Sequence, residues 1–380
     1  MAVVSHTFSP RVGGSERYHR FGARAVSEFA NVAVFTSRES LRGAPDPKPD
    51  PSFAVEYLPS VRLATEDFVS PIRLWRALRK FDPDLVWGNH PSPTADVGAL
   101  FALANGRPWI ATYHADVGSD RWWKRLYLRA ETAFLRKACR VLVTSERYAE
   151  LLRVRGVPAQ RLVVAPPGPY IGDGSPPATN ATFDPALPPR FLFVGALDAG
   201  HRYKRLDLLL AAIAELRAAG RPVSLDVVGD GELRKEWEAR AKHLGLAECV
   251  RFRGRLSDDD LAESFAAATA LVLPAVTEAE GFGSVAVEAI QYGCPVVTST
   301  RVSVGDRLES AGAGIRFDAD RPETLAPVLR RTLDEPGLRE RLAQNSRALA
   351  PRFAWSEVGP RIAAPIAEIL TGRGSPGGRP

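Results

Sequence analysis

Two glutamates, Glu280 and Glu288, flank a glycine-rich turn that reads Glu-Gly-Phe-Gly-Ser-Val over residues 280–285. A helix-forming run follows Gly281 and Gly283, so the free N–H groups and positive dipole end of its first turn should attract an anion such as phosphate. Carboxylates are repelled by phosphate, so the two glutamates suit hydroxyl groups on either side of it. The spacing therefore predicts a sugar–diphosphate–ribose ligand, whereas the alternative is a surface loop followed by an ordinary amphipathic helix.

The whole stretch 277–297 resembles the Glu-(seven residues)-Glu motif of retaining family 4 glycosyltransferases, which have the GT-B fold. In that family the first glutamate holds the transferred sugar, the helix N-terminus holds the diphosphate and the second glutamate holds the ribose. The resemblance implies a front-face displacement assisted by the leaving phosphate, since no carboxylate is obviously placed as a covalent nucleophile. The donor-binding residues that it implies here are Glu280, Gly281, Phe282, Gly283, Ser284, Val285 and Glu288.

A second matching stretch, 195–210, carries Lys204 at a loop–helix junction. In the family a lysine at this place neutralises the donor diphosphate, so the resemblance implies a catalytic role for Lys204. Many relatives have an arginine where this chain has Ala196, and Arg202 is the candidate for that second cation. The alternative for Lys204 is a solvated helix start, where the dipole disfavours a cation unless an anionic ligand is present.

The loop Val228-Gly-Asp-Gly contains Gly229 and resembles the corresponding loop of the family, and Arg255 and Leu256 match its base-contacting segment. The string 228–234 also suggests a dinucleotide fingerprint, but Arg234 stands where the third small residue is needed. An NAD(P) oxidoreductase is therefore the runner-up from another enzyme class.

The first half of the chain offers a third group of candidates. Gly13 and Gly14 open a predicted helix and resemble the Gly-Gly loop that faces donor phosphates and acceptor in the family. His114 lies in a Thr-Tyr-His-Ala-Asp string that resembles a motif whose histidine lies beside the transferred sugar, which implies a catalytic role. The weaker acceptor-side candidates are Arg11, His90 and Asp116.

An Asp-x-Asp string at 258–260 resembles the metal motif of a different glycosyltransferase fold. Its context is a helix start, with Ser257 as the cap and acids near the positive dipole end. We therefore expect no metal at the donor site and no cofactor, with cations and helix N–H groups stabilising the leaving diphosphate.

Strand and helix patterns alternate along the chain and predict an α/β fold of two doubly wound, Rossmann-like domains facing across a cleft, the GT-B architecture. The expected acceptor-side domain is 1–170, joined by a closing helix at 356–370. A proline-rich linker at 171–189 precedes the donor-binding domain at 190–355, and 371–380 is expected to be a disordered tail. Ligands of such sheets bind at the carboxyl ends of the strands.

Net charge, apolar runs and cysteine number indicate which kinds of binding partner and which compartment to expect. A net charge of +6 could suit nucleic acid, but arginines alternate with acids and no nucleic-acid motif is present, so none is expected. No apolar run is long enough to span a membrane and no signal peptide is evident, which with three cysteines predicts a cytoplasmic protein. The basic, aromatic segment 121–140 suits peripheral contact with an anionic membrane. The preferred alternative is a sheet-covering helix with Leu126, Ala130 and Phe134 inward.

These observations predict a retaining glycosyltransferase that moves a hexose from a nucleotide diphosphate sugar to a hydroxyl of a glycan, lipid or small metabolite. A uridine donor is favoured, and GDP-mannose is the next choice. Alternatives within the fold are a nucleotide-sugar epimerase or hydrolase. A basic membrane- or nucleic-acid-binding module is the non-enzymatic alternative.

Overall fold

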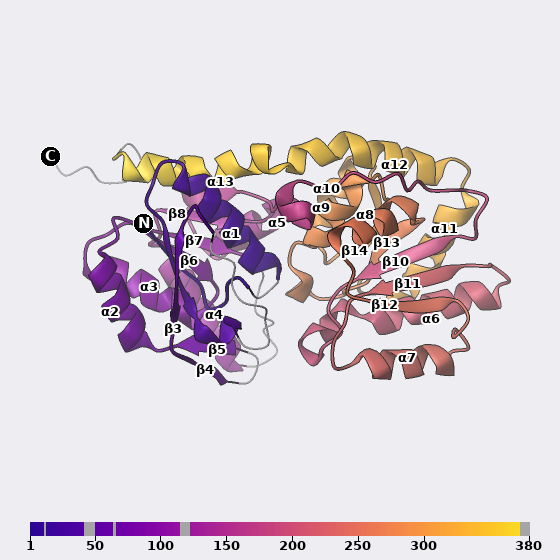
Figure 1. The fold of residues 1–380 in the computed structure, drawn as a ribbon, viewed down its shortest axis with the longest axis horizontal. Helices are drawn as coiled ribbons and strands as arrows, with labels where there is room; N and C mark the ends of the chain where they lie inside the picture. The colour runs from indigo at the N-terminus through magenta and orange to yellow at the C-terminus, as the bar shows by residue number, and fades with distance from the viewer. Residues whose placement is uncertain (11–12, 42–49, 64–65, 115–121, 373–380) are drawn as a thin grey trace. The chain divides into compact units, whose positions relative to one another are not determined.

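The structure is a computed structural model that describes residues 1–10, 13–41, 50–63, 66–114 and 122–372. It divides into two compact units (Figure 1). The first comprises Met1–Pro167 together with the chain from Trp355, and the second is Gly168–Ala354. Segment 171–189, which the sequence suggests as a linker, is counted with the second unit.

A seven-stranded parallel sheet in the order β3-β2-β1-β6-β7-β8-β9 forms the centre of the first unit. The inner strands β1, β2, β6 and β7 are buried along their whole length, as the apolar residues that dominate them favour, whereas the edge strand β3 has exposed residues. The strand order reverses between β1 and β6, and such a switch point is where ligands of doubly wound sheets bind. The strands are β1 (Ala2–Val4), β2 (Ala33–Ser37), β3 (Ala54–Leu58), β6 (Val86–His90), β7 (Trp109–Tyr113), β8 (Arg140–Val143) and β9 (Leu162–Val164).

Helices cover this sheet, and several begin at residues that favour a helix start. Pro71 and Pro93 occupy first-turn positions, where the missing N–H costs nothing, and Ser145 accepts the N–H of Tyr148 at 3.3 Å. The helices are α1 (Gly14–Ser27), α2 (Pro71–Phe81), α3 (Pro93–Ala104), α4 (Trp122–Leu135), α5 (Glu146–Val154) and α13 (Trp355–Leu370). A short antiparallel hairpin, β4 (Ser60–Leu63) and β5 (Glu66–Val69), follows β3 and was not expected from the sequence.

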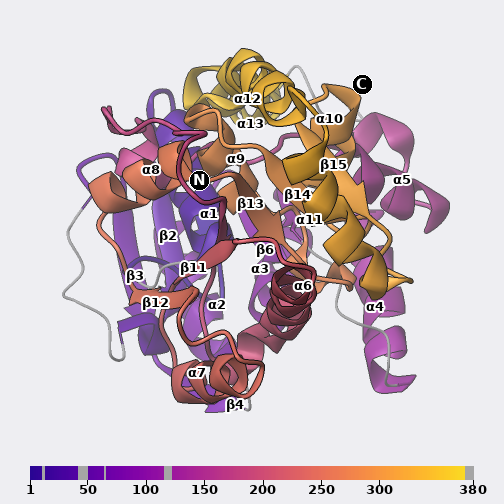
Figure 2. The same cartoon turned by 90° about the vertical axis from the view of Figure 1, so that its right-hand side faces the viewer.

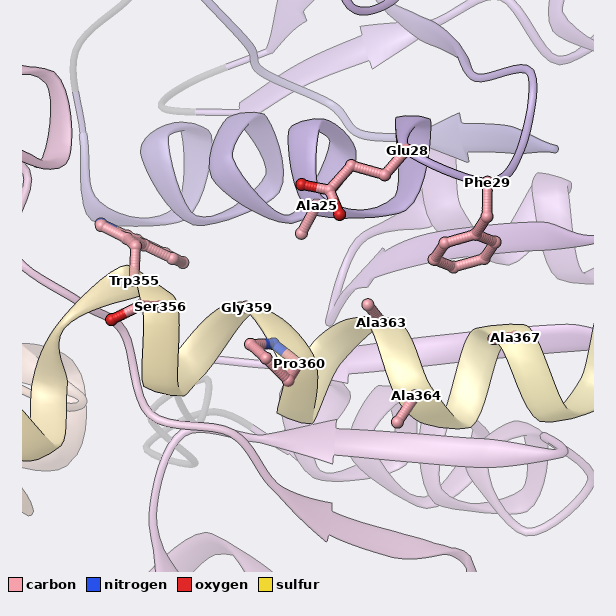
Figure 3. Close-up of a pocket in the computed structure, with 10 residues that line it drawn as sticks. All are labelled: Ala25, Glu28, Phe29, Trp355, Ser356, Gly359, Pro360, Ala363, Ala364 and Ala367. Atoms are coloured by element: carbon pink, nitrogen blue, oxygen red, sulfur yellow. The ribbon is translucent and has the colours of Figure 1, made fainter.

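The closing helix α13 packs along α1 (Figure 3). Trp355 stacks on Phe21 with ring centroids 4.4 Å apart. Gly22 of α1 lies where a Cβ would be 2.5 Å from the Trp87 ring and 3.4 Å from Ile362, so a glycine lets the two helices and the sheet approach. This packing joins the last helix of the chain to the first unit.

The second unit has a six-stranded parallel sheet in the order β12-β11-β10-β13-β14-β15, again with a reversal, between β10 and β13. Alternate residues of β10 point to opposite faces: Phe191 and Phe193 pack in one core and Leu192 in the other. Helices α6 and α11 cover the first core and α8 and α9 the second (Figure 2). Its strands are β10 (Arg190–Val194), β11 (Ser224–Val228), β12 (Val250–Gly254), β13 (Ala270–Leu273), β14 (Val296–Ser299) and β15 (Gly314–Phe317). Its helices are α6 (Leu206–Ala218), α7 (Arg234–His243), α8 (Asp258–Ala267), α9 (Ser284–Gln291), α10 (Val304–Ser310), α11 (Leu325–Asp334) and α12 (Leu338–Leu349).

One expectation about packing is wrong. Leu126 on α4 is 60% exposed and Ala130 is exposed, so these two residues do not point inward as expected, whereas Phe134 is half-buried and packs against the core. The buried face instead contains Leu128, Glu131 and Leu135. The apolar pattern misses it because Glu131 is an acid whose burial depends on a partner in another element.

Candidate donor site in the second unit

Lys204 and Glu280 form a partly buried ion pair at the carboxyl end of the second sheet. Lys204 ends the 3₁₀ helix Ala199–Lys204 after β10, and its Nζ donates to Oε2 of Glu280 at 2.6 Å. Their side chains are 16% and 7% exposed. Gly195, just after β10, makes room for the lysine stem, since a Cβ there would be 2.7 Å from Cδ of Lys204.

Electrostatics keep Lys204 protonated. Burial alone would lower the pKa of Lys204, but the charge of Glu280 and the hydrogen bond to it outweigh burial and raise that pKa. A full positive charge is therefore held at the junction of β10 and α6 at neutral pH. A partly buried pair of this kind gives little net stability by itself, because desolvation offsets the attraction.

The turn after Glu280 has a backbone shape that requires glycine. Gly281 and Gly283 have φ values of 62° and 82°, and a Cβ on Gly283 would lie 2.7 Å from the Val302 side chain. Ser303 Oγ donates to the Gly281 carbonyl at 2.8 Å, which fixes the turn.

Gly283 is the N-cap of α9 and supplies no side-chain cap. The N–H of Ala286 donates to the Gly283 carbonyl at 3.0 Å. The N–H groups of Ser284 and Val285 come before any carbonyl one turn back in the helix, so they suit an anion.

Glu288 lies in α9 and is 6% exposed. Its Oε1 accepts the backbone N–H of Tyr170 at 3.3 Å, which ties the start of the second unit to α9. Burial and the Glu288 charge together raise the pKa of Tyr292 to about 12. Phe282 is buried beneath the turn, while Ser284 and Val285 are half-buried at the helix start.

Gly229 marks a close crossing of two loops at this edge. Its φ is 134°, and a Cβ there would lie 1.9 Å from the Gly195 carbonyl oxygen. No larger residue than glycine fits at position 229.

The two residues that match the base-contacting segment follow β12. Arg255 is exposed, and Leu256 packs partly on the core.

Arg202, the candidate second cation, forms an ion pair with Glu236 and not with a residue of the Lys204–Glu280 pair. Its two terminal nitrogens donate to both carboxylate oxygens of Glu236 on α7, at 2.9 and 2.6 Å. The guanidinium also lies 5.8 Å from the Trp237 ring centroid. Lys204 is therefore the buried cation of the site and Arg202 an exposed, already paired one.

Ser257 caps α8 by accepting the N–H of Asp260 at 3.1 Å. Asp258 Oδ2 accepts the N–H of Gly172 at 2.8 Å. Ser257 is therefore the cap of α8, as the capping interpretation predicts, while Asp258 bonds a backbone N–H 86 positions earlier in the chain.

In the first unit, Gly13 is the extended N-cap of α1 and Gly14 its first residue. A Cβ on Gly13 would overlap the carboxylate of Glu16, to which Thr7 Oγ1 donates at 2.7 Å. Arg11 and Asp116 lie outside the described residues.

His114 follows β7 and stands against two aromatic residues of α1. The ring of His19 is 5.1 Å away and that of Tyr18 4.9 Å, centroid to centroid. Burial, helped by the nearby His19, lowers the pKa of His114 well below its ordinary value, so the imidazole is neutral at pH 7. The sequence analysis did not predict His19 as a site residue. The only feature that could have indicated it is its position soon after the start of the helix that Gly13 and Gly14 open.

His90 is buried in a cluster with Asp96, Tyr127 and Glu131. Its Nδ1 lies 2.7 Å from Oε1 of Glu131. Burial lowers the pKa of His90, but Glu131 outweighs it and the net shift is upward. Asp96, Tyr127 and Glu131 were not among the residues that the sequence suggested, because their spacing along the chain has no recognisable pattern.

Two family models match the chain. The model described as "Glycosyl transferases group 1" matches residues 181–349, and that described as "Glycosyl transferase 4-like domain" matches residues 13–168. The MMP alpha-(1->4)-mannosyltransferase of Mycolicibacterium hassiacum is 28% identical, over 96% of this chain and 97% of the relative. The D-rhamnosyltransferase WbpZ of Pseudomonas aeruginosa is 29% identical, over 76% of this chain and 74% of the relative.

Solved structures of other proteins have a similar fold. HepE from Anabaena in complex with UDP superposes with a TM-score of 0.75 at 19% identity, over 98% of this chain and 100% of that one. Sucrose-phosphate synthase from Thermosynechococcus elongatus gives 0.74 at 21%, over 98% and 100%. The chain is a glycosyltransferase with the GT-B fold, and it belongs to the family 4 type. Among the described residues, no helix has both the length and the apolar character needed to cross a bilayer.

Proposed function

We propose that the protein is a retaining glycosyltransferase that moves a hexose from a nucleotide diphosphate sugar to an acceptor hydroxyl. The observation that carries this proposal is the combination of the Lys204–Glu280 pair, the glycine-shaped start of α9 and the buried carboxylate of Glu288. A cation, the backbone N–H groups of a helix start and two carboxylates match the diphosphate and the two sugars of such a donor.

The residues have separate roles in this proposal. Lys204 and the first-turn N–H groups of α9 hold the diphosphate, whose charge grows as its bond to the sugar breaks. Glu280 accepts hydroxyl groups of the hexose, and Glu288 accepts those of the ribose. Binding the donor replaces the Lys204–Glu280 contact with one contact from each residue to the ligand.

The chemical step forms a bond between the acceptor oxygen and the anomeric carbon on the face that the diphosphate leaves. The acceptor proton passes to the departing phosphate oxygen, so no enzymic base is needed. Neutral His114 is suited to donate a hydrogen bond to a sugar hydroxyl. The helix-start setting of the acids at 258–260, capped by Ser257, supports a donor site that works without a metal.

The donor proposed first is a UDP-sugar. GDP-mannose is the second candidate, and the name of the Mycolicibacterium relative, a mannosyltransferase, favours including it. The acceptor is a hydroxyl of a glycan, lipid or small metabolite. A contact of segment 121–140 with an anionic membrane stays a proposal. Residue 121 of that segment lies outside the described residues.

A thermal-shift screen of UDP, GDP, ADP and dTDP, with their hexose derivatives and NADPH, tests the proposal. A ligand at 100 times its Kd adds about 2.7 kcal/mol to the free energy of unfolding, which moves the melting temperature measurably. We expect one nucleoside diphosphate and its sugar to stabilise the protein. Stabilisation by NADPH alone would contradict the proposal.

A further inference from the structure

His90, Asp96 and Glu131 bring three metal-ligand side chains together inside the first unit, from three different elements. His90 ends β6, Asp96 lies in the first turn of α3 and Glu131 lies in α4. Nδ1 of His90 is 2.7 Å from Oε1 of Glu131 and 3.6 Å from Oδ1 of Asp96. The His90 and Glu131 side chains are 0% and 1% exposed, and that of Asp96 is 17% exposed.

The spacing of these atoms is close to that of a coordination sphere. One ligand atom from each residue lies within 4.8 Å of the others. Ligands held about 2.0–2.2 Å from a tetrahedral zinc ion lie about 3.3–3.6 Å from one another. The 3.6 Å between His90 and Asp96 already fits, whereas the 2.7 Å hydrogen bond between His90 and Glu131 would have to open and lose its proton. Rotation of carboxylate side chains can supply such a change.

Two carboxylate oxygens in the cluster lack a hydrogen-bond partner. They are Oδ1 of Asp96 and Oε2 of Glu131, and both are buried. Tyr127 donates to the other oxygen of Asp96, Oδ2, at 3.2 Å, which orients that carboxylate. Within the described parts of the chain, neither acid forms an ion pair with lysine or arginine. Two buried acids facing one imidazole therefore need a further positive species, which is either a shared proton or a metal ion.

The histidine is held in the orientation that a ligand needs. A Cβ on Gly88 would lie 2.5 Å from Nε2 of His90, so the glycine makes room for the ring. This packing directs the opposite nitrogen, Nδ1, at the two carboxylates. Aligned ligands with a hydrogen-bonded outer residue such as Tyr127 are typical of protein metal sites.

We propose that His90, Asp96 and Glu131 bind one divalent transition-metal ion of the Zn²⁺ class. A mixed imidazole and carboxylate set favours such an ion over Mg²⁺ or Ca²⁺, which prefer oxygen ligands alone. The ion would link β6, α3 and α4 and take no part in glycosyl transfer. Lys204, Glu280 and Glu288 of the donor site lie in the second unit and are not members of this set.

The test uses the full chain without an affinity tag, treated with chelator and dialysed. Zn²⁺ uptake is measured by elemental analysis, Co²⁺ binding by its visible absorption, and stability by thermal melting with each ion. We expect about one ion per chain and a rise in melting temperature. Glu131→Gln and Asp96→Asn should each weaken binding at least about a hundredfold, and Tyr127→Phe by about ten- to a hundredfold.

Two controls separate this site from surface binding and from misfolding. Glu150→Gln removes an exposed carboxylate and His243→Asn an exposed histidine, and both should bind the ion as the unaltered protein does. Circular dichroism of the metal-free variants shows whether they fold. If the unaltered protein binds no ion, or if folded Glu131→Gln and Asp96→Asn bind it equally well, the proposal is wrong. In the first case a shared proton lies between the two acids.

Discussion

The ammonium group of Lys204 and the carboxylate of Glu280 lie 2.6 Å apart although the two residues are 76 positions apart in the chain. Glu280 is the main charged partner of Lys204. Under the proposed function, a donor separates them and takes both contacts. Their pairing therefore links stability, donor affinity and catalysis.

Loss of the lysine should affect the reaction more than donor binding. Lys204→Met should lower kcat by about two to three powers of ten, since a single group that stabilises developing charge contributes about that much. It should also weaken the nucleoside diphosphate product, which carries the full leaving-group charge. Steady-state kinetics and product calorimetry measure both effects. Arg202→Met is the matched control, because Arg202 is already paired with Glu236, and an equal loss there would contradict the assignment.

The ion pair should appear as a coupling in stability. Lys204→Met leaves the carboxylate of Glu280 buried without its partner and should destabilise the second unit more than the double variant Lys204→Met/Glu280→Gln does. A coupling of about 0.5–3 kcal/mol is expected for residues in direct contact. Urea unfolding of the four proteins in the cycle measures it. Additive single effects would show that the contact contributes nothing to the ligand-free fold.

Gly229→Ala should destabilise the second unit by about 2–4 kcal/mol, because the new Cβ would overlap the Gly195 carbonyl. The control is Gly245→Ala, at a glycine that also has positive φ, 73°, but has nothing within 4 Å of the new Cβ. That variant should show only the backbone strain, about 1 kcal/mol. Urea unfolding compares the two. Equal losses would mean that the loop crossing is looser than the structure shows.

Acid should destabilise the first unit partly through His19. Burial lowers its pKa to about 4 from 6.5, so the unfolded chain takes up a proton there before the folded chain does. The free energy of unfolding should therefore fall as the pH drops from about 6.5 to about 4, with a contribution near 1.4 kcal/mol per pH unit. His19→Phe removes this contribution, and urea unfolding across that range should give a shallower slope. An unchanged slope would show that His19 is not buried in its neutral form.

The sequence predicts those parts of the site that are local. The turn at Gly281 and Gly283 is recognisable because left-handed backbone and a helix start need glycine, and alternation of strands and helices predicts both sheets. The Lys204–Glu280 contact could not be predicted, since nothing in the spacing of the two residues indicates it. The same is true of Glu131, whose burial on α4 depends on His90 from a different strand. Sequence patterns predict the helix or strand to which a residue belongs. Its contacts with residues of other elements can be seen only in the folded structure.

Calorimetry of a nucleoside diphosphate and its hexose derivative on two variants tests the central claim most directly. Glu280→Gln should bind the free diphosphate as the unaltered protein does and the nucleotide sugar more weakly, because Glu280 is assigned to the hexose. Glu288→Gln should weaken both ligands about ten- to a hundredfold, the effect of losing a charge-assisted hydrogen bond of about 1.5–3 kcal/mol to the ribose. If Glu280→Gln abolishes binding of the free diphosphate while Glu288→Gln leaves it intact, the donor lies in the opposite direction and the account is contradicted.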